Sequence, residues 1–137
     1  ADEMIRLLHS IRRDRRGQAI VEMALVLPIF ILLVMGIIDF GRLYNAQISI
    51  THASREGARE AAVGTIDSQV ITLTKGAATS LNPDLVTVSI KPDPSGRRKG
   101  DPIIVSVSYR LELITPVIGA MLGGTRDLSV STMMRLE

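Results

Sequence analysis

The feature that most constrains this chain is a long apolar run near its N-terminus. From Met23 to Ile38 no residue is charged, and the run extends backwards to Ala19 past a single acid, Glu22. An α-helix of roughly 20 residues is about 30 Å long, close to the thickness of the hydrocarbon core of a bilayer. The run therefore predicts one transmembrane helix, which we place at residues 18–40.

The charge distribution predicts the orientation of this helix. The chain carries a net charge of +2, and all of it lies in residues 1–17, where five arginines stand against three acids. Positive residues beside the first span favour the cytoplasmic side. We therefore expect a cytoplasmic leader at residues 1–17, an inner-membrane location, and a C-terminal part outside. The folded part has no basic excess, so we expect no nucleic-acid partner.

Two simpler explanations of the run account for less of the sequence. A secretory signal peptide has a shorter apolar core and a small-x-small cleavage site, whereas this run continues into Asp39 and Arg42 without such a site. An ordinary single-pass anchor explains the run but not Glu22. A carboxylate inside a span costs a few kcal/mol at the bilayer centre and less near its edge, and it favours a cationic partner.

Gly17 and Gln18 can supply that partner. If the chain is cut between them, Gln18 carries a free α-amino group and Glu22 becomes the fifth residue of the mature chain. The Glu22 carboxylate could then pair with the amine of its own subunit or of a neighbouring one. This pairing would favour insertion of the helix into an assembly.

These residues also carry a resemblance to a known family. Basic residues, a glycine and an apolar helix with glutamate at its fifth position form the class III signal of type IV pilins and pseudopilins. More narrowly, RGQAIVEMALVLP at residues 16–28, IIDFGR at 37–42 and ASREGAR at 53–59 resemble the TadE-like family of minor pseudopilins. The final strand, with Met133, Met134 and Arg135, is similar to that family too.

The resemblance implies a role in assembling a tight-adherence (Tad) pilus. It implies cleavage after Gly17 by a prepilin peptidase at the cytoplasmic face, and a role for Glu22 in processing or subunit recognition. The implied partners are the membrane, the prepilin peptidase and other pilin or pseudopilin subunits. The first aromatic residue is Phe30, later than in major pilins, which favours a minor subunit.

Pro28 lies inside the span, where it removes a helical hydrogen bond and predicts a kink. It is either a deformable point or a harmless membrane proline. Beyond the span we expect the helix to continue as a stalk over residues 41–64, with Gly64 as its left-handed cap. Apolar residues recur there at steps of three and four: Ile37, Phe40, Tyr44, Ile48 and Thr51.

Small residues also recur on the stalk, at steps of four. Ala53, Gly57 and Ala61 form this stripe, which permits close approach of another helix. We prefer packing against the chain's own domain over packing against a second subunit. Glu56 and Arg59 lie on the opposing polar face and can pair.

Residues 65–137 are expected to form a small head. Asp67 or Ser68 is expected to cap a second helix, which Asn82-Pro83 stops. Its apolar stripe is Val70, Leu73, Ala77 and Leu81. A short helix is expected from a cap at Thr115, with Pro116 first inside, to a stop at Gly123-Gly124.

Three alternating segments predict strands at residues 85–91, 103–113 and 128–136. The loop between the first two is rich in Pro and Gly, and we interpret its basic tip, residues 97–99, as solvated. The predicted fold class is α+β and pseudopilin-like. It comprises a long N-terminal transmembrane helix continuing into a stalk, a second helix and a small three-stranded antiparallel sheet. The strand order stays open.

The sequence offers no catalytic constellation. Its histidines are His9 and His52, without paired metal-ligand spacing, and it has no cysteine. We therefore expect no enzyme activity, no cofactor, no metal site and no small-molecule substrate. The leading hypothesis is a minor pseudopilin or pilus assembly protein. The alternative is an uncleaved, single-pass membrane-anchored module for extracytoplasmic binding or adhesion.

Overall fold

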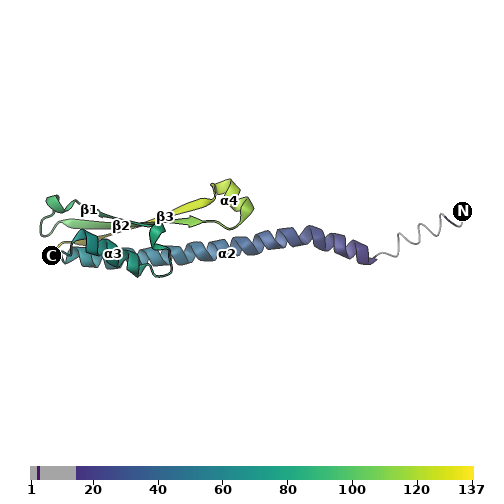
Figure 1. Ribbon diagram of the computed structural model, residues 1–137, viewed down its shortest axis with the longest axis horizontal. Coiled ribbons are helices and arrows are strands. Elements are labelled where there is room, and N and C mark those ends of the chain that lie inside the picture. The colour runs from purple at the N-terminus through teal and green to yellow at the C-terminus, as the bar shows by residue number, and fades with distance from the viewer. Residues whose placement is uncertain (1–2, 4–14) are drawn as a thin grey trace.

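A long helix organises the protein, and a small head lies along its C-terminal half (Figure 1). The computed structural model describes residue 3 and residues 15–137. Most of the predicted leader, residues 1–2 and 4–14, lies outside the described residues. Helix α2 spans Arg15–Ala62, 48 residues without interruption. The predicted continuation of the apolar helix into a stalk is therefore confirmed.

The C-terminal end of α2 is closed as the sequence predicts. Gly64 adopts a left-handed conformation with φ +85°, and its N–H donates to the carbonyl of Ala61 at 3.2 Å. The backbone N–H of Glu137 donates to the carbonyl of Ala62 at 2.9 Å. The end of the chain is thus tied to the end of the long helix.

The head contains a three-stranded antiparallel sheet. Strands β1 (Val86–Lys91), β2 (Pro102–Glu112) and β3 (Thr125–Arg135) pair in the order β1-β2-β3. The sheet is therefore a simple meander, which settles the order that the sequence left open. With helix α3 (Asp67–Ala77) and the short helix α4 (Pro116–Leu122), this confirms the predicted α+β fold class. Two 3₁₀ turns, Pro83–Leu85 and Pro94–Gly96, complete the described elements.

One face of the sheet packs on α2, and the core lies between them. The alternating residues of β2 point inward: Ile103, Val105, Val107, Tyr109 and Leu111 are buried. The facing side of α2 is built mostly from small residues, and it carries the predicted small stripe. Ala53 and Ala61 are at most 1% exposed. The preferred interpretation of the stripe, packing against the chain's own domain, is confirmed.

Gly57 permits the closest approach between α2 and α3. A Cβ added at Gly57 would collide with the hydroxyl of Thr74 and would lie 3.2 Å from Cγ1 of Val105. The Thr74 side chain is fully buried, and its hydroxyl donates to the carbonyl of Val70 at 2.6 Å. A hydroxyl satisfied by its own helix can therefore be buried like an apolar group.

Helix α3 differs from its prediction in three respects. Its N-cap is Ile66, which makes no side-chain capping bond, and the helix ends at Ala77 rather than just before Asn82. Leu73 is 49% exposed, so the predicted apolar stripe is wrong at that position. The neighbouring residue Thr74 is buried instead, and a search for apolar residues alone does not find it.

The loop between β1 and β2 is anchored and not simply solvated. Arg97 donates to both carboxylate oxygens of Asp67, at 2.5 and 2.8 Å, and its Nε donates to the carbonyl of Pro92 at 2.9 Å. The solvated interpretation is therefore wrong for Arg97, while Arg98 and Lys99 are exposed as expected. This bidentate pair also explains why Asp67 does not cap α3.

Candidate functional site

The N-terminal half of α2 carries its apolar side chains on the outside. Among the described residues, α2 is the one helix long and apolar enough to cross a membrane, and no part of its most apolar window is buried. Large side chains along this half are about half to two-thirds exposed: Ile20 69%, Met23 63%, Leu25 69%, Ile29 69%, Phe30 58% and Leu33 58%. Such a continuous row of exposed apolar side chains needs an apolar environment, which indicates membrane anchoring.

The predicted processing residues lie at the start of this helix. Gly17 and Gln18 are helical, and the side-chain amide of Gln18 donates to Oε1 of the exposed Glu22 at 3.2 Å. The two side chains thus meet across one helical turn. The pairing of Glu22 with a new amine at Gln18 stays a prediction.

Pro28 lies in the same exposed half, and the helix continues through it. The predicted kink stays a prediction.

Glycine is about 1 kcal/mol less favourable than alanine inside a helix, so Gly17 lowers the helix stability at the predicted cleavage site. Glu56 and Arg59 make no ion pair with each other in the part of the chain that the structure describes.

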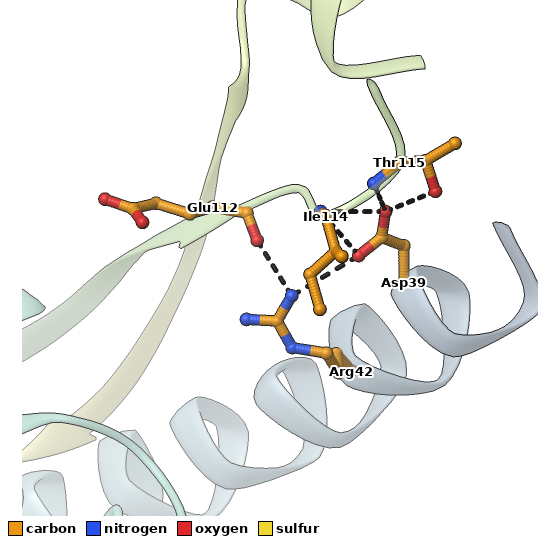
Figure 2. Close-up of polar contacts among 5 residues, drawn as sticks. All are labelled: Asp39, Arg42, Glu112, Ile114 and Thr115. Atoms are coloured by element: carbon orange, nitrogen blue, oxygen red, sulfur yellow. Dashed lines mark hydrogen bonds and ion pairs between the residues drawn. The ribbon is translucent and has the colours of Figure 1, made fainter. Parts of the chain in front are cut away.

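Asp39 is the residue whose importance the sequence did not reveal. It follows the apolar run directly and is only 4% exposed. The backbone N–H of Ile114 donates to its two oxygens at 2.9 and 3.0 Å, and the N–H and hydroxyl of Thr115 both donate to Oδ2 at 2.7 Å. Figure 2 shows these donors converging on one carboxylate.

Arg42 completes this group. Its Nη1 lies 3.3 Å from Oδ1 of Asp39 and donates to the carbonyl of Glu112 at 2.9 Å (Figure 2). We call these five residues the Asp39 clasp: Asp39, Arg42, Glu112, Ile114 and Thr115. The clasp joins α2 to the end of β2 and to the segment that enters α4. The ion pair between Asp39 and Arg42, three residues apart on α2, is the smaller part of the arrangement.

The clasp also corrects the prediction for Thr115. This residue occupies the expected N-cap position of α4, yet its side chain makes no capping bond. Its hydroxyl is used by Asp39, 76 residues away. A buried carboxylate needs several donors to offset its lost hydration, and no local pattern around Asp39 indicates where these donors come from.

The described residues show little that would support chemistry. No group of three or more His, Asp or Glu residues among them could hold a metal ion. One open hollow of about 440 Å³ lies beside Tyr109, Arg110 and Asp127, where Arg110 and Asp127 pair with each other at 3.1 Å. The expectation that the chain is not an enzyme stays a prediction.

The comparisons with known proteins address the N-terminal part. A family model described as TadE-like protein matches residues 17–59. This segment is TadE-like. The resemblance predicted from RGQAIVEMALVLP and the later motifs is thereby confirmed over these residues, and it indicates a Tad pilus-related protein. The likeness of the final strand to the family lies outside the match. No curated protein and no solved structure matches the chain significantly.

The TadE-like match lies entirely within α2. The match begins at Gly17 and ends at residue 59, so it covers nearly all of α2 and includes Asp39 and Arg42 of the clasp. The head elements that these two residues hold, from Glu112 to Thr115, lie beyond it. In the clasp, the residues on α2 therefore lie inside the TadE-like match, and their partners in the head lie outside it.

Proposed function

We propose that this chain is a minor pseudopilin or pilus assembly protein of a Tad-type pilus. It is made as a precursor, inserted with its N-terminus inside, cut after Gly17 by a prepilin peptidase, and incorporated into or beneath the filament. The observation that carries this proposal is the asymmetry of α2. Its N-terminal half is an exposed apolar rod with a TadE-like sequence, and its C-terminal half is the support of a folded head.

The spacing along α2 supports the proposed topology. Gly17 and Asp39 are 22 residues apart in a continuous helix, which corresponds to about 33 Å. This is about the thickness of the hydrocarbon core. If the Asp39 clasp lies at the outer surface, the bond after Gly17 lies at the cytoplasmic surface, where the peptidase acts. Arg15 and Arg16 beside it favour that side.

The position of Glu22 supports a role in assembly. Its carboxylate is exposed on α2, one turn from Gln18, whose side chain it already contacts. After cleavage the α-amino group of Gln18 would stand at the start of the helix, within reach of this carboxylate or of its counterpart on a neighbour. Pairing the two charges lowers the cost of holding either in hydrocarbon.

A second exposed stripe supports lateral packing of subunits. Ile37, Phe40, Tyr44 and Ile48 are 54–69% exposed, although they recur at helical spacing as core residues do. The head covers the other side of α2, where Ala46 and Ile50 are fully buried. The stripe begins inside the proposed span and continues past it to Ile48, so a neighbouring apolar helix can pack along the apolar run and the stripe together.

The N-terminus of the protein extracted from membranes tests the proposal. Mass spectrometry should find a mature chain that begins at Gln18, and substitution of Gly17→Leu should leave the precursor uncut. A chain that retains its leader while pili form normally would refute processing. It would favour the alternative, an uncleaved membrane-anchored binding or adhesion module.

A pair of variants tests the role of Glu22 separately. We expect Glu22→Ala to insert into the membrane normally but to impair pilus assembly, because the new amine then lacks its partner. Glu22→Asp keeps the charge and is the matched control, which should retain part of the assembly. Normal pili from Glu22→Ala would refute the pairing.

A further inference from the structure

The end of the head nearest the apolar run is itself apolar. No residue between Glu112 and Arg126 is charged, and this stretch contains α4. Its large side chains are 39–81% exposed: Ile114, Val117, Ile118, Met121 and Leu122. Gly119 is the buried residue of α4, so most of this short helix faces away from the head. Contiguous exposed apolar surface of this kind marks an interaction site.

The structure holds α4 beside the last turn of the apolar run. Cδ1 of Ile118 lies 3.7 Å from the point where a Cβ on Gly36 would stand. The Asp39 clasp fixes Ile114 and Thr115, which directly precede α4. Figure 1 shows α4 at the end of the sheet that points toward the N-terminal half of α2. The two apolar surfaces are therefore continuous.

We propose that α4 rests in the outer surface of the same phospholipid bilayer that α2 crosses. This inference rests on the proposed anchoring by α2 and adds a second membrane contact to it. If the apolar run ends near Ile38 at the outer surface, α4 lies at the boundary between headgroups and acyl chains. Helices that lie in this boundary bury their apolar face about 5–10 Å deep.

Two features favour lipid as the occupant of this surface. The patch is an extension of the membrane-spanning surface through Gly36 and Ile118, so it meets the bilayer without any separate docking step. Its edge carries the exposed Arg126, directly after the uncharged stretch. A guanidinium at this level suits the phosphate groups of anionic lipids.

The contact would fix how the subunit stands in the membrane. A single helix leaves its tilt to its neighbours and to residues at the membrane surface. With α4 on the lipid and clasped to α2, the head is held against the bilayer at two points. The exposed stripe through Phe40 and Tyr44 is then presented in one direction.

Single cysteines test this inference in the full chain, because the native chain has none. We would introduce Met121→Cys in α4, Ser95→Cys in the loop at the far end of the sheet, and Phe30→Cys in the apolar run. Each carries an environment-sensitive fluorophore and is reconstituted in vesicles of phosphatidylethanolamine and phosphatidylglycerol. Lipids with quenchers near the headgroup or deep in the acyl chains report the depth. Met121 is 81% exposed, so its replacement leaves the fold intact.

We expect the label at Met121→Cys to be several-fold brighter than that at Ser95→Cys and to be quenched by the shallow lipid quencher. The label at Phe30→Cys should be quenched by the deep one. If Met121→Cys behaves like Ser95→Cys while Phe30→Cys is quenched, the α4 contact is refuted and the anchoring stands. If Phe30→Cys is not quenched, the anchoring itself is refuted.

A second copy of the chain is the remaining occupant that the experiment separates. In that case the label at Met121→Cys would be bright without quenching by lipid, and it would dim when the protein is diluted in the vesicles. That result would also overturn the inference. As a further control, Met121→Asp should reduce the lipid quenching of a label at Val117→Cys, since a charge at this depth opposes insertion.

Discussion

Replacing Asp39 by asparagine is the most direct test of the clasp. Asp39→Asn keeps the size of the side chain and one carbonyl oxygen, so it creates no cavity. It replaces the other oxygen by an NH₂ group, which donates and cannot accept. Ile114 and Thr115 bring three donors to this carboxylate. At the position of Oδ1 the NH₂ group faces the donors of Ile114 and Arg42, and at the position of Oδ2 it faces those of Ile114 and Thr115, so at least two donors confront a donor in either orientation.

The magnitude follows from these contacts. A buried donor left without an acceptor costs about 1–3 kcal/mol. The bonds that remain are weaker, because a hydrogen bond to a charged group contributes about 1.5–3 kcal/mol and a neutral one about 0.5–1.5 kcal/mol. Thr115 is 1% exposed, so water does not compensate for this loss without movement of the loop. We expect a total cost of about 2–4 kcal/mol, because the loop relaxes partly. Since about 1.4 kcal/mol is a factor of ten, local opening of the segment should become about 30-fold to several hundred-fold more frequent.

Hydrogen exchange measures this opening directly. The full chain in lipid nanodiscs is followed by mass spectrometry on peptides that include Ile114 and Thr115. Asp127→Asn is the matched control, because Asp127 also pairs with an arginine, Arg110, but both side chains are more than 60% exposed. Such a pair contributes about 0–1 kcal/mol, so exchange in the control should change little.

Two outcomes would contradict the reasoning. Unchanged exchange at Thr115 in Asp39→Asn would mean that the carboxylate does not hold the segment before α4. An equally large effect of Asp127→Asn would mean that any loss of charge at this end of the head loosens it. In either case the clasp would be an incidental contact rather than the joint between helix and head.

Two further substitutions test the packing of the head. Gly57→Ala should destabilise the solubilised chain by about 1–3 kcal/mol in thermal unfolding, because the new Cβ collides with Thr74 and overpacking costs that much. Gly41→Ala is the control: nothing lies within 4 Å of its Cβ, so it should be neutral or stabilising by up to about 1 kcal/mol. If Gly41→Ala were the more destabilising of the two, the close approach at Gly57 would be refuted. Arg97→Ala should lower the free energy of unfolding by about 1–3 kcal/mol and speed hydrogen exchange in the loop between β1 and β2, because it removes a partly buried bidentate pair with Asp67. Unchanged exchange would mean that Arg97 is simply solvated, as the sequence predicted.

The regular elements could be predicted because their residues repeat with a fixed period. The alternation over residues 103–113 predicts one inward face. Five of its residues, from Ile103 to Leu111, are buried, while Leu113 lies just past the end of β2 and is partly exposed. Gly64 and Gly123 ended helices as expected, because both adopt the left-handed conformation that favours glycine. These features depend on neighbours in sequence, so the sequence alone indicates them.

Contacts between distant residues could not be predicted in this way. Asp39 and Arg42 are close in sequence, but the donors that surround the Asp39 carboxylate come from a segment 75 and 76 residues later. Arg97 was interpreted as solvated because a basic loop usually is, while its partner Asp67 was assigned to a cap. Thr74 escaped the apolar stripe because its hydroxyl is satisfied inside its own helix. In each case a polar side chain acts at long range, where periodicity carries no information.

The distribution of large side chains leaves much of the apolar surface of this chain uncovered. Both of its phenylalanines, Phe30 and Phe40, are more than half exposed, and Met121 is 81% exposed. The core, in contrast, is built largely from alanine and β-branched residues. In a soluble domain the largest apolar side chains lie inside, so this inverted arrangement requires an external apolar partner. Lipid can cover the run at Phe30 and the patch at Met121. The stripe that starts at Ile37 and Phe40 continues past the proposed span to Ile48, and the proposed lateral packing of subunits would cover it with a neighbouring apolar helix.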